Sequence, residues 1–76
     1  MQTHLIDLRT IAPGPELLSA VRGMLVVRGT TLSGWCSTHR IDRVWATYAL
    51  TGKRNGPAAK ALRERLIAEA DLAKAA

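Results

Sequence analysis

The chain is poor in cysteine and in aromatic residues, with one cysteine, two tryptophans, one tyrosine and no phenylalanine. A single cysteine excludes a disulfide within the chain and is typical of a reducing cytoplasm. The longest apolar run, Met24–Val27, is far shorter than the roughly 20 residues that cross a bilayer. It is also shorter than the core of a signal peptide. Three aromatic side chains make no stacking array for single-stranded nucleic acid.

The length and composition that remain predict one small domain. The chain has 76 residues, of which 47% are hydrophobic, so the signature of disorder is absent. We expect a single domain over residues 1–76, with an N-terminal arm over 1–13 and a helical core over 15–74. A core of this size is marginal, and oligomerisation is a common supplement to it.

Positive charge is concentrated in one third of the sequence. Residues 40–65 contain seven basic and two acidic side chains, and this excess equals the net charge of +5 of the whole chain. A local excess of this kind attracts a polyanion and speeds encounter with it. A solvated helix face is the alternative interpretation of a charge run alone.

The first half of the chain divides at a proline-rich break. Between residues 1 and 12, alternating polar and apolar residues predict either a short strand, which pairs with a second copy, or an irregular arm. Pro13 to Pro15 then break the chain, with Gly14 as N-cap and Pro15 at the first helical position. The helix predicted from Pro15 to about Val27 ends before Gly29. Its buried face is Leu17, Leu18, Val21, Met24 and Leu25.

Two short helices and a longer one follow. Thr30 or Thr31 is the expected N-cap of a helix whose inward residues are Leu32, Trp35 and Cys36. Asp42 is the expected N-cap of a helix from Arg43 to Thr51, which Gly52 ends. Pro57 opens a last helix that reaches about Ala73. Its predicted buried stripe is Ala58, Leu62, Leu66 and Ala70, with Ile67 outside the stripe as a candidate dimer contact.

The spacing of the two short helices predicts a helix-turn-helix. A small residue, Cys36, lies where the two helices must approach closely, and Ala46, Ala49 and Leu50 form the buried stripe of the second helix. A helix held rigidly across another in this way can enter the major groove of DNA. The predicted fold class is therefore all-α, a compact four-helix domain that contains a helix-turn-helix.

This segment also resembles a known group of regulators. Trp35 to Asp42, followed by Ala46, Ala49-Leu50 and Gly52, resembles the helix-turn-helix of the Ner-like and lambda-repressor-like DNA-binding proteins of phages. The loop Arg54 to Pro57, before an alanine-rich helix, is also similar to that group, and the resemblance covers about residues 15 to 73. It implies a cytoplasmic, usually dimeric, transcriptional regulator.

The chain departs from the pattern of that group at three positions. Arg40 replaces the usual turn glycine, and it is strained by roughly 1–2 kcal/mol if the turn requires a positive φ. Ala46 is smaller than the common Val or Ile. Asp42 replaces Ser, which preserves the cap but adds a negative charge.

The candidate contacts to DNA follow from these positions. Arg43 opens the third helix, where it can bind guanine through O6 and N7. The other candidate base contacts are on the side of that helix opposite its buried stripe, and the candidate phosphate contacts are in the turn and in the basic loop. The base contacts are Arg43, Val44, Thr47, Tyr48 and Thr51, and the phosphate contacts are Arg40, Lys53, Arg54 and Asn55.

Other chemistry has little support in the sequence. No paired carboxylates, Ser/His/Asp set or phosphate-binding glycine loop is present, so no catalytic residue, cofactor or small-molecule ligand is expected. Cys36 and His39 are spaced i, i+3, but His4 is the only other soft ligand, and no metal site is expected. Trp35 and Cys36 are interpreted as core residues rather than as a stacking platform or a nucleophile.

Two functions fit the sequence. The first is a sequence-specific regulator of transcription that binds double-stranded DNA, a repressor acting as a homodimer on an inverted repeat. It would act in the cytoplasm of a bacterial or phage-infected cell, associated with the nucleoid and not with a membrane. The alternative is a small helical protein-interaction module, such as a phage inhibitor or adaptor, which docks on an acidic protein surface.

Overall fold

The computed structural model describes residues 7–75 and, for residues 73–75, the backbone alone. A single 3₁₀ turn, η1 (Leu8–Thr10), precedes four α-helices. The helices are α1 (Pro15–Val27), α2 (Leu32–His39), α3 (Arg43–Thr51) and α4 (Pro57–Ala75). No strand is present among the described residues. The predicted all-α, four-helix class is therefore confirmed.

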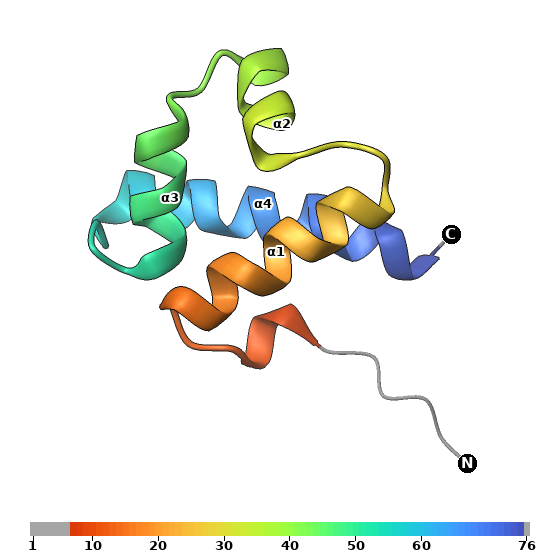
Figure 1. The fold of residues 1–76 in the computed structure, drawn as a ribbon. Helices are drawn as coiled ribbons and strands as arrows, with labels where there is room; N and C mark the ends of the chain where they lie inside the picture. The colour runs from red at the N-terminus through yellow and green to blue at the C-terminus, as the bar shows by residue number, and fades with distance from the viewer. Residues whose placement is uncertain (1–6, 76) are drawn as a thin grey trace.

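The long helices α1 and α4 pack against each other, and α2 and α3 lie together on one side of that pair (Figure 1). Helix α3 contacts both α1 and α4, while η1 contacts the same two helices from the other side. The core is one cluster built mainly from leucine, alanine and valine. Its fully buried members are Leu8, Leu17, Val21, Leu25, Ala46, Ala49, Leu50, Ala59, Leu66 and Ala70.

The helix ends lie where the sequence signals predict them. Gly14 precedes the proline that begins α1, and the side chains of Thr31 and Asp42 accept hydrogen bonds at the starts of α2 and α3. After α1, Gly29 has φ 89°, and the Thr30 N–H donates to the Leu25 carbonyl over 3.0 Å. This left-handed residue with its long-range bond is a Schellman motif, which satisfies the last carbonyls of a helix.

Three details of the predicted helix faces and arm are corrected. Leu8–Thr10 form a 3₁₀ turn that buries Leu8 completely, rather than part of a strand. The rest of the strand prediction, residues 1–6, lies outside the described residues. On α4, Ala59 is buried and Ala58 is exposed, and Ile67 is 4% exposed and belongs to the core. A stripe spaced only at i+4 drifts around a helix of 3.6 residues per turn, so the true face alternates i+3 and i+4 steps.

Candidate nucleic-acid interface

The turn between α2 and α3 contains an arginine whose backbone is in the left-handed helical conformation. Arg40 has φ 58° and ψ 44°, the Ile41 N–H donates to the Cys36 carbonyl over 2.8 Å, and the Arg40 N–H donates to the Ser37 carbonyl over 3.2 Å. This is a second Schellman motif, with arginine where glycine is usual. Cys36 is 1% exposed. The turn therefore does require a positive φ at Arg40, which was the condition for strain at this position.

The C-terminal end of α3 is held by a buried cation. The Arg63 guanidinium donates to the Ala49 carbonyl and to Asn55 Oδ1, both over 2.8 Å. The Gly14 N–H donates to the Leu50 carbonyl of the same turn over 3.0 Å. The sequence counted Arg63 within the basic excess of residues 40–65, whereas its side chain fastens α3 and the following loop to α4.

The free side of α3 opens into a hollow of about 690 Å³ between α1, the start of α2 and α3. Four of the five candidate base contacts line this hollow, namely Arg43, Val44, Thr47 and Tyr48. Val44 is 47% exposed, and the Thr47 hydroxyl donates to the Arg43 carbonyl over 3.0 Å. The fifth, Thr51, does not line the hollow; its hydroxyl donates to the Tyr48 carbonyl over 3.4 Å.

Helix α1 forms the opposite wall of this hollow, and sequence reasoning missed its contribution. Leu18, Arg22 and Val26 line it. Their i, i+4, i+8 spacing places them on one face of α1, beside its fully buried residues. Leu18, predicted on the buried face, is only partly buried. The sequence therefore contained the signal that these three residues belong together. It did not contain the packing that turns this face toward α3.

The candidate phosphate contacts are divided between two places. The Lys53 ammonium lies 4.5 Å from the centre of the Tyr48 ring, which keeps this cation close to the free side of α3. Arg54 is exposed in the loop, and the Asn55 side-chain oxygen accepts a hydrogen bond from Arg63. Arg40 instead lines a second, more open hollow of about 440 Å³ between the turn and α4, together with Trp45.

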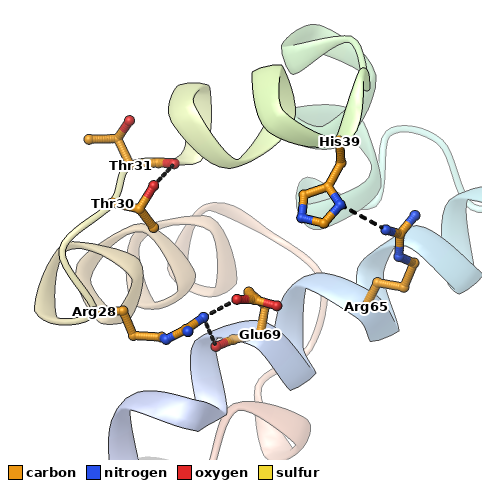
Figure 2. Close-up of polar contacts among 6 residues, drawn as sticks. All are labelled: Arg28, Thr30, Thr31, His39, Arg65 and Glu69. Carbon is orange, nitrogen blue, oxygen red and sulfur yellow. Dashed lines mark hydrogen bonds and ion pairs between the residues drawn. The ribbon is translucent and has the colours of Figure 1, made fainter.

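Three other arginines bind groups of the protein itself. Arg9 pairs with Asp71, and Arg28 pairs with Glu69 and also donates to the Glu69 carbonyl over 3.3 Å. Arg65 lies 3.4 Å from His39 Nδ1. Figure 2 shows the ends of α1 and α2 fastened to α4 through the Arg28 and His39 contacts.

The same corner contains the stacked Trp35. Its ring centre lies 4.3 Å from that of His39 and 5.4 Å from the Arg65 guanidinium carbon. The residue is 5% exposed, and its buried indole nitrogen has no hydrogen-bond partner within residues 7–75. Trp35 therefore belongs to the core, as the sequence predicted, and not to a stacking surface.

The Cys36 thiol is held in its neutral form. Burial raises its pKa above the ordinary value of 9.0, the Asp42 carboxylate raises it further, and the Arg43 guanidinium opposes them. A nucleophilic cysteine requires the opposite shift. Within the described chain, no three His, Cys, Asp or Glu side chains gather to hold a metal ion, and no helix has the length and apolarity to cross a membrane.

Comparison of the chain with protein families, with curated proteins and with solved structures gives no significant match.

Proposed function

We propose that this protein binds double-stranded DNA with sequence specificity and regulates transcription, with α3 as the helix that enters the major groove. The observation that carries the proposal is the free side of α3. It presents Arg43, Val44, Thr47 and Tyr48 to one open hollow, while Ala46, Ala49 and Leu50 of the same helix are fully buried. A short helix fixed in this way by a tight turn is how helix-turn-helix proteins present side chains to base edges.

The side chains of α3 suggest which bases the protein recognises. Arg43, in the first turn, suits guanine O6 and N7, a pairing worth about 1–3 kcal/mol of discrimination. Val44 and the methyl group of Thr47 suit the C5-methyl group of thymine. Lys53 and Arg54, just beyond the helix, suit phosphate contacts, which set the register without reading sequence.

A homodimer is part of the proposal because one short helix reads few base pairs. Two copies related by a two-fold axis place their recognition helices about 34 Å apart, in successive major grooves of an inverted repeat. A bound dimer would repress by blocking polymerase. The oligomeric state on and off DNA is measured by sedimentation, and the expected complex holds two chains per site.

Selection of bound sites from a random duplex library tests the proposal directly. The expected result is a preferred inverted repeat, bound more tightly than a random duplex of equal length. The Arg43→Ala variant should lose preference at one base pair of each half-site. The Lys60→Ala variant is the matched control, because it removes the same charge from an exposed position on α4, outside the residues that line the hollow.

Two results would contradict sequence-specific binding. One is equal affinity of the wild-type protein for all duplexes in fluorescence anisotropy. The other is a preferred site that Arg43→Ala and Lys60→Ala bind with the same preference as the wild-type protein.

The second candidate function, a protein-interaction module, is favoured by the apolar part of the same hollow. Val26 is 62% exposed and Val44 is 47% exposed, and both line it. Apolar side chains beside cations also suit an amphipathic acidic partner. Purification of the protein with and without nuclease treatment separates the two functions. A partner protein that co-purifies in stoichiometric amount after the treatment favours the alternative. A 260 nm absorbance that co-purifies with the protein and disappears after the treatment favours DNA.

A further inference from the structure

Two arginines from different helices line the hollow. Arg43 comes from the start of α3, and Arg22 is the only cation of α1. The residues that line the hollow include no aspartate or glutamate. Like charges on facing walls repel each other, and an anion placed between them relieves that repulsion.

Arg22 differs from the other arginines of the N-terminal half, which form ion pairs within the protein. Arg9 and Arg28 each pair with a carboxylate of α4. Arg22 is exposed, and among the contacts of the described chain it has neither an ion pair nor a hydrogen bond from its side chain. Its guanidinium is thus available to an external anion.

The packing of α1 on α3 determines which part of a duplex Arg22 can reach. Helices in contact lie about 8–10 Å apart, axis to axis, and each is about 10–12 Å across. The major groove is only about 12 Å wide. If α3 occupies the groove, α1 has no room beside it there and lies against the sugar-phosphate backbone that borders the groove.

We infer that α1 is a second DNA-binding element, and that Arg22 holds a backbone phosphate of the strand bordering the groove that α3 enters. Leu18 and Val26, one turn before and after it, form the apolar wall along which that strand passes. This inference rests on the proposed function, and it adds a contact that positions the protein on the duplex without reading sequence.

Salt dependence distinguishes this contact from a base contact. Each phosphate neutralised by a cation contributes about −0.9 to the slope of log K against log salt concentration for B-DNA. In the proposed dimer each chain contributes one Arg22, so Arg22→Ala should make the slope shallower by about 1.8 and weaken binding roughly 60-fold at 0.1 M salt, by the same relation. The ratio of affinities for the selected and random duplexes should stay unchanged. Arg22→Lys should retain the slope, because it keeps the charge.

Fluorescence anisotropy with both duplexes at several salt concentrations measures these quantities for Arg22→Ala, Arg22→Lys, Arg43→Ala and Lys60→Ala. Circular dichroism checks that each variant is folded, which we expect because Arg22 is exposed. If Arg22→Ala and Lys60→Ala have the same slope and affinity while Arg43→Ala loses specificity, the α1 contact is overturned and the proposed function stands. If the wild-type protein binds neither duplex, both are overturned.

Discussion

The left-handed Arg40 has a measurable energetic consequence. A residue with a Cβ atom at φ 58° carries about 1–2 kcal/mol of strain that glycine lacks, against about 0.5–1 kcal/mol of extra chain entropy that glycine loses on folding. Arg40→Gly should therefore raise the free energy of unfolding by up to about 1.5 kcal/mol. Arg40→Ala, which removes the same charge but keeps the Cβ, is the control. Urea denaturation in which the glycine variant is no more stable than the alanine variant would refute the strain.

Arg63 is expected to matter for stability rather than for direct contact with DNA. The residue is 9% exposed, and its guanidinium donates to the Ala49 carbonyl and to Asn55 Oδ1. Hydrogen bonds from charged donors contribute about 1.5–3 kcal/mol each, and the burial of the charge offsets part of this. Arg63→Ala should lower the free energy of unfolding by about 2 kcal/mol.

The variant Arg63→Met separates the lost hydrogen bonds from the lost packing. Methionine fills much of the space but donates nothing, so it should recover only part of the stability in urea denaturation. A methionine variant as stable as the wild-type protein would show that packing alone accounts for the effect.

The buried thiol of Cys36 should make the folded protein less stable at alkaline pH. In the unfolded chain the thiol titrates near its ordinary pKa of 9.0, and in the folded protein burial raises that pKa. The folded state therefore holds the proton more tightly, and stability falls as the pH rises from about 9 through the higher folded pKa. Denaturation curves at increasing pH should show a steeper loss for the wild-type protein than for Cys36→Ala. Parallel losses in the two proteins would contradict this origin.

At the scale of the helices, two glycines allow a paired test of packing against intrinsic propensity. An alanine Cβ at Gly23 in α1 meets nothing within 4 Å, so Gly23→Ala should stabilise the protein by about 1 kcal/mol through helix propensity. At Gly34 in α2 the same Cβ lies 3.2 Å from each hydroxyl of Thr30 and Thr31. The Thr31 hydroxyl also accepts the capping bond from the Gly34 N–H over 2.9 Å.

Because the Thr31 hydroxyl cannot withdraw without weakening that cap, Gly34→Ala should gain little or lose stability. Thermal denaturation of the two variants measures the difference. Equal stabilisation of both would show that the Thr30–Thr31 segment yields without cost.

The helices themselves were largely predictable because their signals are local. Their ends are specified by capping residues and by residues of special backbone geometry, namely Pro15, Thr31, Asp42 and Gly52. Both effects depend only on neighbours in sequence. The sequence leaves the segment around Leu8 open between a short strand and an irregular arm, because alternation over a few residues does not distinguish a strand from a turn that buries one side chain. Its burial depends on α1 and α4, which contact η1.

For the molecule as a whole, the sequence showed where the positive charge is concentrated but not which groups each cation contacts. The count of cations placed the net charge of +5 in residues 40–65, yet Arg63 of that segment is buried in contacts within the protein. Arg22, outside the segment, lines the hollow with Arg43. Such reassignments come from packing between helices distant in sequence, which no local pattern encodes. The prediction that α3 has a free side needed only its own periodicity.

The charges beyond the end of α3 give a final prediction for the whole protein. If Lys53 and Arg54 of each chain neutralise one phosphate apiece, the double variant Lys53→Ala/Arg54→Ala should have a salt slope shallower by about 3.6 in the proposed dimer. Its preference for the selected duplex should persist, since phosphate contacts carry no sequence information. The control Arg9→Ala/Lys60→Ala removes the same net charge from positions outside the hollow. Binding titrations in which the two double variants have the same slope would assign the loss to net charge, and the loop would then have no direct contact with the DNA backbone.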